Sequence, residues 1–345
     1  MKVGIIGGGF GLTVQAPIIN THPKMKVTAI STMKRHQLPK ELKGEKNTPA
    51  HYKDWTDMVN REELDLVFVS SIPFYHFKIV KYALEKGIKN IVCEKPFTMN
   101  SNESKELLKL SKEYKANVLI DFEWRYLPAR QKVKELIMNH TIGDILHFEY
   151  HTSSAQYNNL IFNKRGWMGE KQKFGGMLGA LGTHMLDCLN WLVTDEIDMI
   201  NGLVHTHIPI GAGEQRDADD AFFIHGKMKN NSTFSIQLIS GIHHGFGSSL
   251  RIFGKEGTIT LTNDQQLCLG KMDEQLIDIT IKNERKFPPN LSAEASSYYP
   301  AFYPFLEKLY EYIVYNKVDR DLPTIEVGHR NQVALAAILA KSLNE

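Results

Sequence analysis

Short apolar runs alternate with amphipathic segments over the first third of the chain. The apolar runs, which we predict to be strands, lie at residues 3–6, 27–30, 66–70, 90–93 and 117–121. Between them, apolar residues recur at helical spacing at residues 12–21, 77–86 and 101–114. Near-continuous apolar strands that alternate with helices are typical of a parallel sheet covered by helices on both faces. Ligands of such sheets bind at the carboxyl ends of the strands.

The pattern changes after Asp121. The predicted elements that follow are helices at residues 129–139, 180–193, 303–315 and 328–343, a strand at 145–151 and a strand-like region at 197–282. In that region Phe234, Ile236 and Leu238 alternate with polar residues. Such alternation predicts antiparallel strands with one exposed face. The segment Gly254–Gly257, between two apolar runs, predicts a hairpin turn.

Length and composition bound the function without identifying it. The 345 residues, of which 42% are hydrophobic and 23% charged, suffice for two domains with separate cores. Lys and Arg exceed Asp and Glu by only 41 − 39 = 2, which argues against nucleic-acid and membrane partners. Cys93, Cys188 and Cys268 lack zinc or dithiol spacing, and we expect no metal site. Because the first residues lack a signal-peptide pattern, we expect a cytoplasmic protein.

A glycine cluster stands directly between the first predicted strand and the first predicted helix. Gly7, Gly9 and Gly11, with Phe10 among them, form a GxGxG string whose third glycine comes one residue earlier than in GxGxxG. Glycines at this place let the pyrophosphate of a dinucleotide approach backbone amides at a helix N-terminus. The alternative is a tight turn without a ligand. The position between strand and helix favours a dinucleotide site.

The second predicted strand ends in a polar, basic segment that contains Ser31, Thr32, Lys34 and Arg35. An acidic residue at this place would bind the adenosine ribose of NAD, and the segment has none. Hydroxyl groups followed by two cations suit the additional phosphate of NADP. We therefore expect NADP to be preferred to NAD, with a solvated basic loop as the alternative.

Two further segments follow predicted strands at the same expected edge of the sheet. Ser71, Pro73 and His76 come after the third strand, and Glu94 and Lys95 come after the fourth. Because the proline after Lys95 fixes the next turn, the Lys95 ammonium has a defined direction. The alternative is that Glu94 makes a structural ion pair with a neighbour.

Together with Gly175–Gly176 and Gly182–Asp187, these motifs resemble the Gfo/Idh/MocA family of oxidoreductases, which includes inositol and glucose-fructose enzymes. The resemblance extends over nearly the whole chain. It implies an α/β Rossmann dinucleotide-binding domain at residues 1–121. It also implies an open, mostly antiparallel α+β sheet domain at residues 122–345, for the substrate and for oligomerisation, with the C-terminal helices packed back toward the cleft.

The resemblance implies that Lys95 and His184 lie near the nicotinamide. Many members have an Asp four residues before the histidine, where this chain has Ala180. Asp187 shares the helix face of His184 and is the candidate to orient its imidazole, with a bond to a neighbouring amide as the alternative. The candidates for lining the nicotinamide end or the substrate, with packing or surface roles as the alternative, are Arg125, Arg165 and Trp167.

We therefore expect an enzyme that transfers a hydride between NADP(H) or NAD(H) and a carbinol or carbonyl carbon of a small polyhydroxylated substrate. Lys95 or His184 transfers the hydroxyl proton, and the sequence does not decide between them. Proteins that resemble this family also include regulators that bind a dinucleotide without turnover and NAD-dependent glycosidases. The presence of Lys95 and His184 argues against the first, and the expected NADP preference argues against the second. An exposed sheet face suggests a homodimer or homotetramer.

Overall fold

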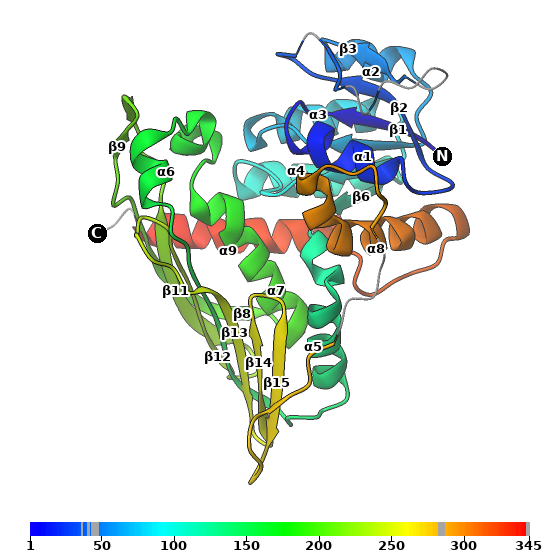
Figure 1. The fold of residues 1–345 in the computed structure, drawn as a ribbon. Coiled ribbons are helices and arrows are strands. Elements are labelled where there is room, and N and C mark those ends of the chain that lie inside the picture. Colours follow the sequence, from blue (N-terminus) through cyan, green and yellow to red (C-terminus); the bar gives the residue numbers. More distant parts are fainter. Residues whose placement is uncertain (36, 40–41, 43–47, 282–286, 343–345) are drawn as a thin grey trace. The chain divides into compact units, whose positions relative to one another are not determined.

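The computed structural model describes residues 1–35, 37–39, 42, 48–281 and 287–342. Two predicted segments end at Lys282 and Leu343, which lie outside the described residues. The chain divides into two compact units, each with its own large sheet (Figure 1). The first unit comprises residues 1–126 and 284–329, and the second comprises residues 127–283 and 330–345.

The first unit is built on a six-stranded sheet with the strand order β3-β2-β1-β4-β5-β6. All of its strands are parallel, as predicted, so that their carboxyl ends meet at one edge. The sequence pattern does not predict β3, because three residues are too few to show a periodicity. The strands are β1 (Lys2–Ile6), β2 (Lys26–Ser31), β3 (Ala50–Tyr52), β4 (Leu66–Val69), β5 (Asn90–Cys93) and β6 (Asn117–Ile120).

Helices cover both faces of this sheet, because successive residues of a strand point to opposite sides. Ile5 and Phe68 pack in a cluster with the helices on one face, which are α1 (Ala16–Ile19) and α8 (Ala293–Tyr315). Their neighbours Ile6 and Val67 pack in a second cluster. The helices of that cluster are α2 (Trp55–Arg61), α3 (Pro73–Glu85) and α4 (Ser101–Glu113).

Helix α8 begins at Ala293, well before the predicted start at residue 303. Pro300 and Pro304 lie inside it, and proline in a helix interior ordinarily indicates an end. Here the fully buried Phe302 and Phe305 hold the helix against the first sheet. Residues 284–329 thus belong to the first compact unit, whereas the sequence assigns them to the second domain.

The second unit contains an eight-stranded sheet with the order β16-β15-β14-β13-β7-β12-β11-β8. Its strands pair antiparallel except β7 and β12, which are parallel. The predicted hairpin is present as β13 and β14. The strands are β7 (Ile145–Ser153), β8 (Ile197–His205), β11 (Ala221–Met228), β12 (Thr233–Ile239), β13 (Gly247–Gly254), β14 (Gly257–Thr262), β15 (Gln266–Lys271) and β16 (Ile277–Asp278), with β9 (Ile210–Gly211) and β10 (Glu214–Gln215) as a separate pair.

One face of this second sheet is packed and the other is more exposed. Phe234, Ile236 and Leu238 on β12 are buried, as the alternation predicts. Helix α7 packs against β7, and α5 packs against α7. Within the described parts of the chain, none of the helices has the length and apolar character that a membrane span needs. The remaining helices are α5 (Pro128–Met138), α6 (Tyr157–Phe162), α7 (Thr183–Val193) and α9 (Ile325–Ser342).

Candidate active site

The glycine cluster forms the turn between β1 and a helical turn, η1 (Gly11–Gln15). At two positions glycine is needed because a Cβ atom would collide with a neighbouring residue, and not because the backbone is left-handed. A Cβ on Gly7 would lie 2.1 Å from the carbonyl oxygen of Ser70, and one on Gly11 would lie 2.7 Å from the Ser70 Cβ. The Cβ position of Gly9, by contrast, has no atom of the described residues within 4 Å. Gly7 and Gly11 are therefore required by packing, and Gly9 leaves open space of the kind that a pyrophosphate needs.

The end of β2 exposes only part of the predicted cofactor-binding set. Lys34 and Arg35 are exposed, whereas Ser31 and Thr32 are buried. Thr32 Oγ1 donates to the Arg35 carbonyl at 3.2 Å and lies 2.7 Å from His51 Nε2. The Thr32 hydroxyl group is therefore engaged with groups of the protein itself, Arg35 and His51. The hydroxyl thus holds the loop, and the two cations are the groups available to a phosphate.

His76 connects the loops that follow β4 and β5. Its ring is fully buried, with Nδ1 2.9 Å from the Pro96 carbonyl and Nε2 2.9 Å from the Ser71 carbonyl. Burial lowers the pKa of His76, and a neutral imidazole donates to only one of these carbonyls at a time. Pro73 is the first residue of α3, and the Lys95–Pro96 peptide bond is cis. The structure therefore gives His76 a role in holding the loops, and its contact with a cofactor stays a prediction.

Gln15, which the sequence analysis does not identify, joins residues that follow three other strands. Its Nε2 donates to Glu94 Oε1 at 2.8 Å and to Asp121 Oδ2 at 2.7 Å, and its Oε1 accepts from Ser70 Oγ. Desolvation raises the pKa of Glu94, an effect that the neighbouring Lys95 ammonium opposes. Burial raises the pKa of Asp121 well above its ordinary value. A glutamine in a helix has no sequence signature of its own, so only the fold reveals this network.

Arg125 belongs to the first unit, in the short helix η3 (Glu123–Tyr126). Its side chain is buried, and its Nη1 donates to the backbone carbonyl of Asp321 at 3.0 Å. This contact ties η3 to the segment that follows α8. A substrate contact by Arg125 stays a prediction.

In the second unit, the segment before α7 is shaped by Gly176 and Asp219. Gly176 has φ +97°, and a Cβ there would lie 2.2 Å from Asp219 Oδ1. Asp219 accepts the backbone N–H of Leu178 at Oδ2, at 2.8 Å, and that of Met177 at its carbonyl, at 3.1 Å. These bonds satisfy N–H groups at the start of the helical segment η6 (Leu178–Gly182), which continues into α7. Burial raises the pKa of Asp219 to about 7.

His184 and Asp187 are both buried on α7. The residue before His184 is fixed twice: Thr183 Oγ1 donates to the Gly179 carbonyl at 3.1 Å, and the Thr183 carbonyl accepts from Asn331 Nδ2 at 2.9 Å. The start of α7 is thus held firmly. Orientation of the His184 imidazole by Asp187 stays a prediction.

Arg165 and Trp167 lie against the turn that precedes η6. The Arg165 amide donates to Glu214 Oε2 at 2.7 Å, and its Nη2 donates to Met177 Sδ at 3.8 Å. A Cβ on Gly175 would lie 2.5 Å from the Trp167 carbonyl. The structure therefore brings Arg165 and Trp167 together with Gly175. Lys95 belongs to the first unit and His184 to the second, and their joint action stays a prediction.

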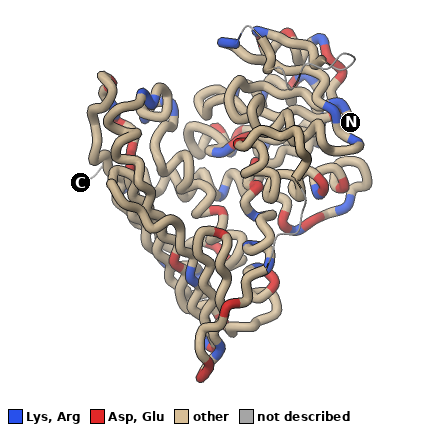
Figure 2. Tube along the Cα trace, in the orientation of Figure 1, with Lys and Arg blue, Asp and Glu red and all other residues tan. Residues whose placement is uncertain are grey.

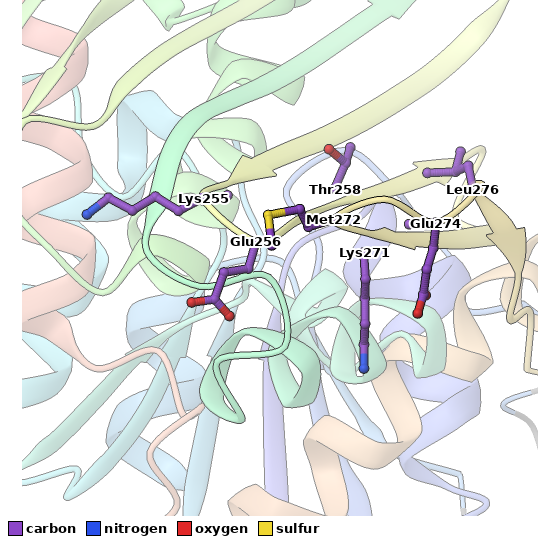
Figure 3. A pocket seen from close by; sticks show the side chains of 10 residues that line it. Lys255, Glu256, Thr258, Lys271, Met272, Glu274 and Leu276 are labelled. Carbon is purple, nitrogen blue, oxygen red and sulfur yellow. The ribbon is translucent and has the colours of Figure 1, made fainter.

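The second unit has an open hollow between the β13–β14 turn and the β15–β16 segment (Figure 3). Its lining includes Lys255, Glu256, Lys271 and Glu274 and none of the predicted site residues. Along both units, cationic and anionic positions are interspersed (Figure 2). The hollow therefore adds nothing to the candidate site.

Two family models match successive parts of the chain. The model of an oxidoreductase family with an NAD-binding Rossmann fold matches residues 1–122, and that of the GFO/IDH/MocA C-terminal domain matches residues 130–260. An uncharacterized oxidoreductase of Synechocystis sp. is 28% identical over 278 residues, which are 76% of this chain and 72% of that protein. The levoglucosan dehydrogenase of Pseudarthrobacter phenanthrenivorans is 24% identical over 296 residues, with 77% and 74% covered.

Solved structures share the fold over the full chain. A levoglucosan dehydrogenase in complex with NADH has a TM-score of 0.86 at 20% identity, with 100% of this chain and 97% of that one covered. A super-repressor mutant of Gal80p from Saccharomyces cerevisiae has a TM-score of 0.83 at 15% identity, with 100% and 96% covered. At these identities the likeness concerns the fold alone. With models of one family matched in succession along its length, the chain belongs to the GFO/IDH/MocA family of oxidoreductases.

Proposed function

We propose that the protein is an NADP(H)-preferring dehydrogenase or reductase, also able to use NAD(H), that acts on a carbinol or carbonyl carbon of a small polyhydroxylated substrate. The observation that carries this proposal is the open approach at Gly9, at the same end of the parallel strands from which Lys95 emerges. Family membership supports oxidoreductase chemistry. Two relatives named levoglucosan dehydrogenase and glucose-6-phosphate 3-dehydrogenase support a carbohydrate substrate.

The proposed mechanism divides the work between the cofactor and the chain. When bound, the cofactor supplies or accepts the hydride. The turn at Gly9 lets backbone amides approach the pyrophosphate, and Lys34 and Arg35 bind the additional phosphate of NADP. Lys95 donates a hydrogen bond to the reacting oxygen, and Lys95 or His184 moves the hydroxyl proton. The residues proposed to line the nicotinamide end or the substrate are Arg125, Arg165, Trp167 and Asp187.

The other functions receive less support. The likeness to Gal80p concerns the fold alone, so it does not favour a regulator without turnover. Exposed Lys34 and Arg35 favour NADP, and a glycosidase that keeps NAD permanently bound does not need the additional phosphate.

The free cysteines, of which Cys93 and Cys188 are buried, support the proposed cytoplasmic location.

We also propose a homodimer or homotetramer through the sheet of the second unit. Met199 and Leu203 on β8 are 47% and 42% exposed, and Leu203 pairs across the strands with the half-buried Phe223. Apolar side chains on an open sheet face are a usual site of association. Sedimentation velocity should show an oligomer that Leu203→Lys dissociates, with Lys86→Ala, on the exposed end of α3, as the unaffected control. A monomeric wild-type protein contradicts this proposal.

The function is tested by following cofactor absorbance with a panel of sugars, inositols and their keto derivatives, each with NADP and with NAD in both directions. We expect turnover of at least one panel member, with the higher kcat/KM for the NADP couple. Tight cofactor binding without turnover of any panel member would favour a regulator. Release of a sugar from a glycoside without net cofactor reduction would favour a glycosidase.

A further inference from the structure

Asp121 has no task in the mechanism above, although it lies at the same end of the strands as Lys95. Asp121 and Gln15 are both fully buried. The two acceptors of Gln15 Nε2 are Glu94 Oε1 at 2.8 Å and Asp121 Oδ2 at 2.7 Å. An amide nitrogen carries two hydrogens, so each carboxyl group receives one of them. One buried amide therefore holds two carboxyl groups in a fixed relation.

The second oxygen of Asp121 points to a missing proton. Asp121 Oδ1 is buried and receives no hydrogen bond from any described residue, which is costly for a charged carboxylate. Glu94 and Asp121 accept from the same Gln15 nitrogen, so their carboxyl groups lie close together. Two ionised carboxylates so placed repel each other, and a hydrogen bond between them requires a proton on one of them. A proton on Asp121 satisfies its oxygen and removes the repulsion between the two groups.

The surroundings favour the same protonation. The charged and titratable groups that act on the pair come from every element packed against it, namely Lys95 and Cys93 at the end of β5, Glu123 in η3 and Tyr298 on α8. Glu123 raises the pKa of Asp121 and the Gln15 hydrogen bond lowers it, while the Lys95 ammonium lowers the pKa of Glu94. With two desolvated carboxyl groups on one Gln15 amide and a third, Glu123, raising the pKa of Asp121, the pair is more stable with one proton than with none.

We propose that Glu94 and Asp121 together hold one proton in the cofactor-free protein and release it to solvent when the oxidised cofactor binds beside Lys95. The release step rests on the proposed function, because the positive charge of the oxidised nicotinamide is what favours a second carboxylate. The reduced ring is neutral and supplies no such charge. On release the charge of the carboxyl pair changes from −1 to −2, and Lys95 neither gains nor loses a proton.

The first test is an infrared spectrum of the cofactor-free protein near neutral pH. We expect a carbonyl stretch of a buried protonated carboxyl group that Asp121→Asn removes. Asp219→Asn serves as the matched control, because it alters a second desolvated carboxyl group in the other unit. A spectrum in which Asp121→Asn removes no protonated carboxyl band overturns the proposal.

The second test measures proton release with a pH indicator dye in weak buffer on addition of NADP⁺ or NADPH. Both carry the same phosphates, so their difference isolates the charge of the nicotinamide. We expect NADP⁺ to release up to about one proton more than NADPH does, and Asp121→Asn, but not Asp219→Asn, to abolish this difference. Equal release by both cofactors, or an unchanged difference in Asp121→Asn, overturns the release step.

Two outcomes need separate treatment. If Asp121→Asn does not fold, Glu94→Gln, at a half-buried position, replaces it: the band of the protonated Asp121 carboxyl group should then shift, because its carboxylate partner is gone, and an unchanged band overturns the proposal. If neither NADP nor NAD binds, the proposed function fails and the release step fails with it. The infrared band still decides whether the pair holds a proton.

Discussion

Lys95 is the residue on which the proposed chemistry depends most directly. We expect Lys95→Met to lower kcat by about 10²–10³, the usual cost of one lost charge-stabilising donor, and to change cofactor affinity only a few-fold. Steady-state kinetics and a fluorescence titration of the cofactor measure the two effects separately. Turnover within a few-fold of the wild-type rate would show that Lys95 is structural.

His184 is the second candidate for the proton transfer. Its ordinary pKa lies closest to neutrality among side chains, so in the oxidation direction kcat/KM should rise with pH as the imidazole becomes neutral. We expect His184→Asn to be slower by about 10²-fold and to lose the acidic limb of the profile. A variant that keeps both the rate and the limb assigns the base to Lys95, and the same profile in Lys95→Met completes the comparison.

Lys34 and Arg35 carry the expected cofactor preference, because Thr32 is engaged with His51 and the Arg35 carbonyl. A hydrogen bond to a charged group contributes about 1.5–3 kcal/mol, or roughly tenfold to a hundredfold in affinity. Lys34→Ala and Arg35→Ala should each weaken NADP⁺ binding by this factor and leave NAD⁺ binding nearly unchanged. Calorimetric titration of both cofactors, with Lys86→Ala as control, measures the difference. Wild-type protein that binds NAD⁺ as tightly as NADP⁺ contradicts the preference.

At the scale of elements, we expect two glycines of the β1–η1 turn to have different roles, Gly7 in stability and Gly9 in cofactor binding. Gly7→Ala forces a Cβ onto the Ser70 carbonyl, and we expect a loss of about 1–3 kcal/mol in the free energy of unfolding. In Gly9→Ala the added Cβ lies more than 4 Å from every other described side chain and backbone atom that could obstruct it, so its stability should stay near that of the wild type while cofactor binding weakens. Urea denaturation and cofactor titration of both variants test this contrast. If both substitutions change stability and cofactor binding to the same extent, the separate roles of Gly7 and Gly9 are contradicted.

The start of the η6–α7 segment should depend on pH through Asp219. Its pKa is raised from 3.8 to about 7, so the neutral form is favoured in the folded state. The stability that Asp219 contributes is therefore fully present below its ordinary pKa and declines as pH rises toward about 7. In that window the free energy of unfolding of wild type, relative to Asp219→Asn, should fall by at most about 1.4 kcal/mol per pH unit. If urea denaturation shows that the free energies of unfolding of wild type and Asp219→Asn change with pH in the same way, the raised pKa of Asp219 is contradicted.

Helices and strands with a clear hydrophobic periodicity can be predicted from the sequence. Residues whose role depends on contacts with distant parts of the chain cannot. β5 and the alternation on β12 are set by apolar patterns within a few residues. Gln15 and Asp219 act on residues distant in the sequence, so neither leaves a local pattern. His51 lies on a strand too short to show one. The glycine turn is recognised from its sequence, but only the fold separates the packing role of Gly7 from the open space at Gly9.

At the scale of the whole molecule, the sequence predicts two sheets of the correct kinds but not the path of the chain between them. The predicted boundary after residue 121 follows the change of hydrophobic period. The first compact unit also takes up residues 284–329, because α8 supplies one layer of its core. A period describes an element and not the sheet on which that element packs.

The late position of α8 has a consequence for biosynthesis. A ribosome delivers β1 to β6 first, yet the cluster that contains Phe68 and Val92 is completed by Phe302 and Phe305. The part of that face which α8 covers therefore stays exposed until nearly the whole chain has been translated, because α1 covers only the remainder. Exposed apolar surface of this kind attracts chaperones or aggregates. A fragment that ends at Tyr126 keeps every strand of the first sheet but lacks this cover. We therefore expect the first unit to complete its core only after α8 has been translated, and not when β6 has been.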